Sequence, residues 1–273
     1  MLTTPHAAGS AQLTFTRSGT RTVLTRAFAA SPAKLIESNR RDATCWVYAA
    51  TLGGGLVSGD DIQLTADVTA GARALLTTQA STKVYRSLRP CRQSVSATVG
   101  AHAMLAVVPD PIVCFAGADF TQTHRYELHA DASLVLVDWI TSGRHASGER
   151  WAFSRYESRF DIRRASRRIF WDGVVLEPFI DSVADRMGRY DVLLTAILTG
   201  PLVDRAAREL VNRMSQQAIG RDTGFVASAA AIRGGGALVR MAGMSVEQVA
   251  RVLRTDLAFL PDLTGDDFWR GKW

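Results

Sequence analysis

Strict alternation of apolar and polar residues is the feature that most restricts how this chain can fold. The clearest case is 62–69, Ile-Gln-Leu-Thr-Ala-Asp-Val-Thr, where the character changes at every step. Successive side chains of a β-strand point to opposite faces, so a period of two is typical of a strand with one buried face. Strand-like segments continue from Leu13 to about Pro178, which predicts a β-rich fold.

Three other segments add detail to this β-rich region. Residues 133–140 form an apolar run that only Asp138 interrupts, which predicts a strand covered on both faces. The Asp-Gly pair at 172–173 separates two apolar runs and tolerates the positive φ of a type I′ turn, so we expect a hairpin turn there. The Pro-Asp-Pro sequence at 109–111 predicts a turn or a sheet edge, because proline cannot donate to a strand ladder.

Helical periodicity appears only near the C-terminal end. From Asp204 to Ala218, apolar residues recur at spacings of three and four, and the arginines fall largely on the other side. Ser245 and Gln248 have the spacing of a capping box, with Ser245 as the N-cap residue and Gln248 reaching back. An apolar stripe follows to Leu257, so we expect a second helix there.

These patterns divide the chain into three parts. Residues 224–232 and 237–242 predict a short hairpin that turns at consecutive glycines. We expect a flexible N-terminus over 1–12, a β-rich domain over 13–200, and a C-terminal part over 201–273 with two helices and that hairpin. The predicted fold class is mainly β, with large β-sheets and a small C-terminal α-helical part.

Composition indicates a soluble protein of a reducing compartment. Hydrophobic residues make up 47% and charged residues 21% of the chain, the balance of a folded domain. No apolar run approaches the roughly 20 residues that span a bilayer, and no signal-peptide pattern is present. Cys45, Cys91 and Cys114 lie far apart, which fits a reducing compartment better than a disulfide framework. We therefore expect a cytoplasmic protein without a membrane partner.

The net charge of +6 includes one dense basic patch, Arg163–Arg168. Such a patch suits an acidic protein or a polyanion, but no zinc-finger spacing, RNP-like run or helix-turn-helix accompanies it. Nucleic acid is therefore not an expected partner. A β-rich module that binds a protein or a polyanion through residues 163–168 stays open as an alternative function.

Two glycine-containing segments have P-loop spacing but lack P-loop chemistry. Gly54 and Gly59 are followed by Asp60 and Asp61, where a phosphate site needs Lys and Ser or Thr, and carboxylates repel a triphosphate. The segment at 143–150 fails in the same way, since Glu-Arg follows its second glycine. The glycines make sense instead as tight backbone geometry, so we expect no nucleotide site.

Two acidic residues in apolar surroundings allow a structural and a functional interpretation each. Asp60 has the parity of Ile62 and so points toward the apolar side of its strand, where it either caps the glycine turn or faces a polar site. Asp138 either binds the 142–144 turn or pairs with Arg144, or it faces a polar cavity.

Residues 74–86 predict one extended strand, since β-branched residues are frequent there. In that conformation one face carries a row of polar groups, which suits either a wet passage or an exposed sheet surface. The members of this row are Leu75, Thr77, Gln79, Ser81, Lys83 and Tyr85.

Signatures of metal binding and of catalysis are both absent from the sequence. The five histidines form no HxH or HExxH pair, and the cysteines form no CxxC, so we expect no tightly bound metal or cofactor. No GxSxG elbow and no Ser, His and acid set with diagnostic spacing occurs, so the chain is not expected to be an enzyme. A hydrolase using Asp60 and Asp138 as a carboxylate pair is the enzymatic alternative.

Several segments together resemble the UreD (UreH) family of urease accessory proteins. The resemblance covers about residues 13–215 and leaves little signal in the C-terminal third. Its segments are Gly-Gly-Gly-Leu-Val-Ser-Gly-Asp at 53–60, Leu-Thr-Thr-Gln-Ala-Ser-Thr-Lys-Val-Tyr-Arg at 76–86, Pro-Asp-Pro at 109–111, Gly-Arg at 143–144 and Gly-Glu-Arg at 148–150.

The resemblance implies a helically wound, stacked β-sheet domain with C-terminal helices. It also implies a non-enzymatic chaperone for GTP-dependent nickel incorporation into urease, with UreF, the GTPase UreG and apo-urease as partners. Ni²⁺ would be bound only transiently, on its way through an internal polar tunnel. The residues that match such a path are Asp60, Thr78, Ser81, Thr82, Asp138 and Glu177. Scattered oxygens suit a conduit, which must release its cation.

Overall fold

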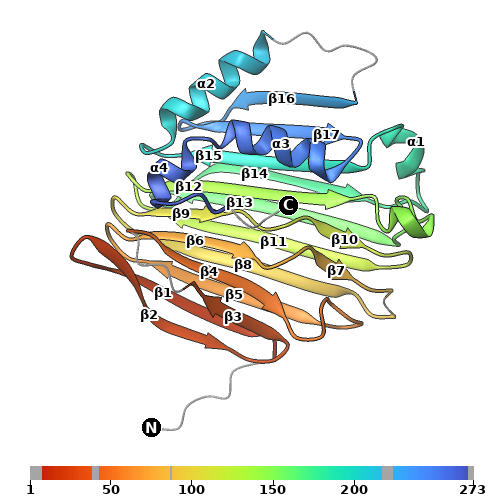
Figure 1. Cartoon of the computed structure of the whole chain (residues 1–273), viewed down its shortest axis with the longest axis horizontal. Helices are drawn as coiled ribbons and strands as arrows, with labels where there is room; N and C mark the ends of the chain where they lie inside the picture. Colours follow the sequence, from red (N-terminus) through yellow and green to blue (C-terminus); the bar gives the residue numbers. More distant parts are fainter. Residues whose placement is uncertain (1–7, 39–42, 87, 217–223, 270–273) are drawn as a thin grey trace.

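Two stacked β-sheets and a layer of helices make up the molecule (Figure 1). The computed structural model describes residues 8–38, 43–86, 88–216 and 224–269. Within these ranges, seven strands form what we call the outer sheet. Their order is β14 (Arg167–Leu176), β13 (Arg155–Arg164), β11 (Asp119–Leu128), β8 (Cys91–Val99), β5 (Asp61–Val68), β1 (Ser10–Ser18) and β2 (Arg21–Ala29).

The other sheet, which we call the central sheet, has ten strands in the described ranges. Eight follow in the order β16 (Phe225–Ala231), β17 (Ala237–Gly243), β15 (Val192–Thr199), β12 (Ser133–Thr141), β9 (Met104–Val107), β6 (Arg73–Thr78), β4 (Cys45–Thr51) and β3 (Ala33–Glu37). The short strand β10 (Ile112–Cys114) pairs with β12 and with β7 (Thr82–Val84).

The chain winds between the two sheets as a helix of strands. From β4 onward it alternates between central and outer strands: β4, β5, β6, β8, β9, β11, β12 and β13, with β7 and β10 as short additions. Neighbours along each winding are parallel, as in β5 with β8 and β6 with β9. The prediction of a mainly β, helically wound and stacked fold with a small C-terminal helical part is confirmed.

Strand β12 of the central sheet has a nearly continuous apolar sequence because both of its faces are covered. All of its residues are buried, because one face packs on the outer sheet and the other on the helices. Leu136 and Ile140 join the core between the sheets, whereas Val137 and Trp139 join the core under the helices. The predictions for β12 and for the alternating β5 are both confirmed.

Helices α2 (Asp204–Ser215) and α3 (Val246–Asp256) cover the central sheet together with the short α4 (Leu260–Thr264). The predicted start of α2 is confirmed, but its predicted end at Ala218 lies outside the described residues. The Ser245 Oγ accepts a hydrogen bond from the Gln248 backbone N–H at 3.2 Å, as a capping residue does. Among the helices of the described ranges, none has both the length and the apolar character that crossing a bilayer requires.

The C-terminal hairpin is confirmed and extends the central sheet, because β16 pairs with β17 and β17 with β15. Two short helical segments had no sequence signal, α1 (Val183–Met187) and the 3₁₀ turn η1 (His145–Ser147). At the N-terminal end, β1 begins at Ser10, and Ala11 is already part of the core.

The hairpin turn predicted at 172–173 is wrong. Strand β14 runs through both residues, with Gly173 opposite Arg159 of β13. The turn lies instead at Ala165 and Ser166, whose φ values are 45° and 62°. A turn at 172–173 would leave half of β13 without its antiparallel partner, so strand pairing outweighs the local preference of Asp-Gly.

Candidate functional site: a polar cavity between the sheets

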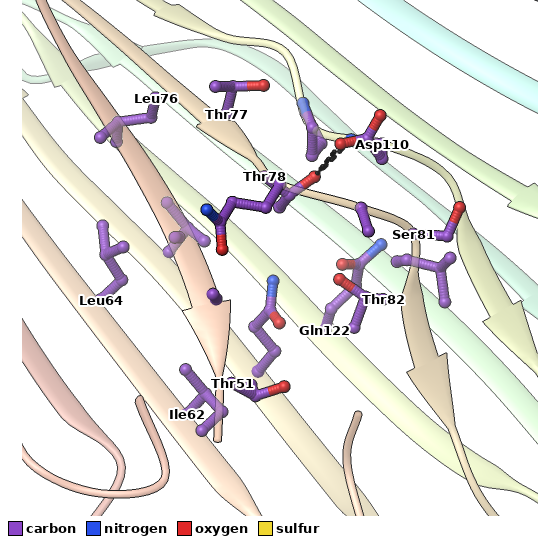
Figure 2. Close-up of a pocket in the computed structure, with 18 of the residues that line it drawn as sticks. Thr51, Ile62, Leu64, Leu76, Thr77, Thr78, Ser81, Thr82, Asp110 and Gln122 are labelled. Atoms are coloured by element: carbon purple, nitrogen blue, oxygen red, sulfur yellow. Dashed lines mark hydrogen bonds between the residues drawn. The ribbon is translucent and has the colours of Figure 1, made fainter. Parts of the chain in front are cut away.

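A cavity of about 310 Å³ opens between the outer and the central sheet (Figure 2). Its apolar lining includes Ile62 and Leu64 of β5 and Leu76 of β6, and its polar groups gather where β6 ends. Figure 2 shows Thr78, Ser81 and Thr82 around this space. Both sheets therefore contribute to one cavity that is apolar on one side and rich in hydroxyls on the other.

A break in the strand brings the hydroxyls together. Strand β6 ends at Thr78 and β7 begins at Thr82, so the predicted single strand over 74–86 is wrong. Because the backbone leaves the extended conformation at 79–81, every residue from Leu76 to Lys83 reaches the cavity, and the side chains do not alternate between two faces. A polar lining in this segment agrees with the wet-passage interpretation. The predicted division of the segment into a polar and a small-residue face is not observed.

Residues 53–59, which we call the glycine loop, pair with β7 directly after this break, and the pairing explains one glycine of the loop. The Leu56 backbone N–H donates to the Lys83 carbonyl at 2.8 Å, and the Tyr85 N–H donates to the Leu56 carbonyl at 3.0 Å. A Cβ on Gly55 would lie 2.6 Å from the Lys83 carbonyl oxygen, closer than real contacts allow. Glycine at this position is therefore a requirement of close backbone approach.

Asp138 lies in the wall of the cavity and is held by uncharged donors. Its Oδ1 accepts from the Gln122 Nε2 at 2.7 Å, and its Oδ2 accepts from the Ser158 Oγ at 2.8 Å and the Tyr156 Oη at 3.2 Å. These partners come from β11 and β13 of the outer sheet, so the carboxylate bridges the two sheets. Burial raises the pKa of Tyr156, and the neighbouring Asp138 raises it further, so that hydroxyl stays a donor.

Asp138 thus lines the cavity, as its functional interpretation expects, but a functional role for it stays a prediction; the predicted pair with Arg144 is wrong. Arg144 instead bonds to Glu149, through its Nε at 3.1 Å. That pairing lowers the pKa of Glu149, mainly through the side-chain hydrogen bond.

A second buried carboxylate lines the same cavity. The Thr78 Oγ1 donates to Asp110 Oδ2 at 2.7 Å and accepts from the Asp110 backbone N–H at 2.7 Å (Figure 2). Asp110 is only 4% exposed, so the Pro-Asp-Pro segment is an interior loop and the predicted alternative of a sheet edge is wrong. The Pro-Asp-Pro segment drew attention to Asp110 in the sequence, but nothing there indicated that Asp110 would bind Thr78.

Two of the six predicted path residues lie outside the lining. Asp60 accepts from the Val57 backbone N–H at 2.8 Å, so it caps the glycine turn as its structural interpretation predicts. Glu177 binds the Arg155 Nε at 2.8 Å at the end of β14. The cavity thus brings together Thr78, Ser81, Thr82 and Asp138. Since Asp60 is not in its wall, the hydrolase alternative finds no Asp60–Asp138 pair there.

His124 of β11 is a lining residue that the sequence analysis did not identify as functional. It is 4% exposed, and its ring stacks on Phe160 with centroids 5.0 Å apart. Burial lowers the pKa of His124, and the neighbouring Asp138 opposes this shift only in part. The sequence signal for His124 was its position in the strand. It lies on the same strand face as the buried Phe120, Gln122 and Tyr126, and the residues between them are exposed or half-buried.

Comparison with known proteins places the chain in a family. The family model described as UreD urease accessory protein matches residues 7–267. A protein named urease accessory protein UreD from Sorangium cellulosum is 49% identical over 97% of this chain and 85% of its own length. Urease accessory protein D from Arabidopsis thaliana is 36% identical over 90% of this chain and 95% of its own length.

The chain belongs to the UreD family of urease accessory proteins. The match to the UreD family runs to residue 267, well past the 13–215 over which the motifs carry the resemblance. Within the fold, two of those motifs, the glycine loop and the Leu76–Arg86 segment, form one side of the cavity.

The UreD-family fold also shows the state of the basic patch at 163–168. Arg168 binds both oxygens of Asp161, at 2.9 and 3.0 Å, and Arg163 lies 3.5 Å from the same carboxylate. Arg164 donates to the Ala130 and Ala132 carbonyls, each at 2.9 Å. Most of the patch is therefore engaged within the chain, which lends the polyanion-binding alternative no support.

Metal chemistry in this UreD-family chain is sparse. Across those parts of the chain that the structure describes, no three or more His, Cys, Asp and Glu side chains form a group able to hold a metal ion. The cavity offers instead separate oxygens and one imidazole, an arrangement that gives only weak contacts to a cation.

Proposed function

We propose that this chain is a non-enzymatic chaperone of urease maturation that works in the cytoplasm. Its membership of the UreD family supports a role in urease maturation. In the proposal it joins UreF and the GTPase UreG on apo-urease, and nickel is incorporated as UreG hydrolyses GTP. The aspartates that follow the glycine loop, where a P-loop needs Lys and Ser or Thr, agree with leaving GTP to the partner.

The observation that carries the proposal is the buried carboxylate of Asp138 in a polar cavity between two sheets. A carboxylate with only uncharged donors attracts a cation, and the hydroxyls of Thr78, Ser81 and Thr82 replace part of a hydration shell. We propose that Ni²⁺ passes through this cavity as cargo. A path role for Asp60 and Glu177 stays a prediction that requires the path to extend beyond the cavity.

Weak binding is what such a passage needs. A site built from several imidazoles or thiolates would hold Ni²⁺ too tightly to release it. Scattered carboxylate and hydroxyl oxygens hold a hydrated cation briefly, so the donor set of the cavity suits transfer better than storage.

The test uses Asp138→Asn in cells that express urease with UreF and UreG at limiting nickel. We expect less nickel per purified urease, while the variant still co-purifies with UreF and UreG, because Asn keeps the shape and an acceptor. Asp172→Asn is the matched control, since Asp172 pairs with Arg240 away from the cavity lining. Normal nickel content with Asp138→Asn, or loss of the complex, would contradict a passage at Asp138.

A further inference from the structure

His124 stands out among the buried polar groups because it is aimed at the cavity and bonded to nothing in the described part of the chain. Its Nδ1 and Nε2 are both buried without a hydrogen-bond partner there. One ring face is fixed by the stack on Phe160, whose plane is inclined by 11°. Unpaired buried donors and acceptors destabilise a fold, so an imidazole kept this way calls for a functional explanation.

The protonation state of His124 suits a ligand. Burial lowers its pKa from the ordinary value of 6.5, so the ring is neutral at physiological pH. A neutral imidazole has one N–H donor and one nitrogen with a free lone pair. The ring therefore presents a nitrogen that can bind a metal ion without first losing a proton.

Asp138 lines the same cavity as this imidazole. Gln122, which bonds to Asp138, is two residues from His124 on the same face of β11. The charge of Asp138 acts on the His124 ring, and both residues line the cavity. An imidazole without a partner and a carboxylate with only uncharged partners thus face one space.

We propose that His124 is a selectivity residue, which with Asp138 gives a passing cation a brief nitrogen-and-oxygen site that favours Ni²⁺ over Mg²⁺. This inference rests on the proposed function. Imidazole nitrogen suits Ni²⁺, whereas Mg²⁺ demands oxygen ligands and gives up its water reluctantly. One imidazole and one carboxylate are too few to trap the ion, so selection and release are compatible.

Equilibrium dialysis of the untagged full chain against NiCl₂, with and without excess MgCl₂, tests the proposal. The wild type is expected to retain Ni²⁺ in the presence of Mg²⁺. His124→Phe keeps the stack on Phe160 but removes both nitrogens. We expect Ni²⁺ affinity to fall at least about tenfold, because removing a residue that only hydrogen-bonds to a metal ligand already costs that much.

The control is the double variant His102→Gln/His129→Gln, because both histidines are exposed and pair with Asp131 on the surface. It is expected to bind Ni²⁺ as the wild type does. Unchanged binding by His124→Phe, or loss of binding in the double variant, would overturn the proposal.

A measurement on the wild type keeps the test valid if His124→Phe fails to fold. Titration of the full chain with substoichiometric NiCl₂ should broaden the imidazole ¹⁵N signals of His124 before those of His102 and His129. Undisturbed His124 signals would overturn the inference. If urease activation needs Asp138 but not His124, and Ni²⁺ leaves the His124 signals undisturbed, the selectivity role alone fails. If activation does not need the chain at all, the proposed function fails.

Discussion

At the scale of single residues, Asp138 shows how this fold keeps a charge inside. Three uncharged donors from two outer-sheet strands hold its oxygens, and the cavity leaves room beside it. A buried carboxylate is tolerated only when hydrogen bonds replace those of water. Among the described residues no cationic side chain forms an ion pair with Asp138, although Lys83 also lines the cavity, and a carboxylate without an ion-pair partner suits a mobile cation.

Replacing Asp138 by Leu should destabilise the protein. The donors of Gln122, Tyr156 and Ser158 would lose their common acceptor, and an unpaired buried donor costs about 1–3 kcal/mol. We expect the free energy of unfolding in urea to fall by that order. Asp138→Asn, which retains an acceptor oxygen, should lose less; equal stability of the Leu variant and the wild type would show that the network contributes nothing.

His124 should make stability depend on pH. Because burial lowers its pKa from 6.5, the unfolded chain binds a proton there at pH values where the folded chain does not. The stabilisation is therefore complete above about pH 6.5 and is lost as pH falls below it, by up to about 1.4 kcal/mol per pH unit. Urea unfolding of wild type and His124→Phe between pH 7 and 5 measures this, and parallel pH curves would contradict it.

At the scale of elements, the β13–β14 hairpin has a turn whose residues do not suit its geometry. Ala165 and Ser166 both have positive φ, a conformation that costs about 1–2 kcal/mol for an ordinary residue and that Asn and Gly adopt readily. Ala165→Asn with Ser166→Gly should therefore raise the free energy of unfolding by about 1 kcal/mol. A lower urea midpoint for this variant would contradict the turn described here.

Strands β5 and β12 and the β13–β14 hairpin together show what the sequence could and could not predict. Strands β5 and β12 were predictable because their burial is encoded in consecutive residues. The turn was not, because Asp-Gly at 172–173 is a local preference, whereas the position of the turn depends on which residues of β14 pair with β13.

The cavity follows the same division. Its carboxylate at Asp138 and its hydroxyls were identified from the sequence, since a polar residue in an apolar run is visible there. The partners of Asp138 were not, because Gln122 and Ser158 reach it from the opposite sheet. The break at 79–81 was also missed, since the segment after it pairs with Leu56 and with β10, contacts that the residues of 74–86 alone do not specify.

At the scale of the whole molecule, the winding of the chain creates the cavity. Each turn of the winding adds one strand to each sheet, so the space between the sheets continues across many strands, and apolar side chains fill most of it. The cavity lies where polar side chains reach this interface from three places: strand β6, strand β11, and the loop that precedes β10. Helices α2, α3 and α4 cover the far face of the central sheet, and of the helices described only the short α1 adds a buried side chain, Val183, to the core between the sheets.

Nickel content of urease measures the central claim most directly. Urease, UreF and UreG would be expressed at limiting nickel with this chain, without it, or with its Asp138→Asn variant, and nickel per urease active site and urease activity would be determined together. We predict active, nickel-loaded urease only with the wild-type chain, and little of either with the variant. Full nickel loading and activity without the chain would contradict its role in urease maturation.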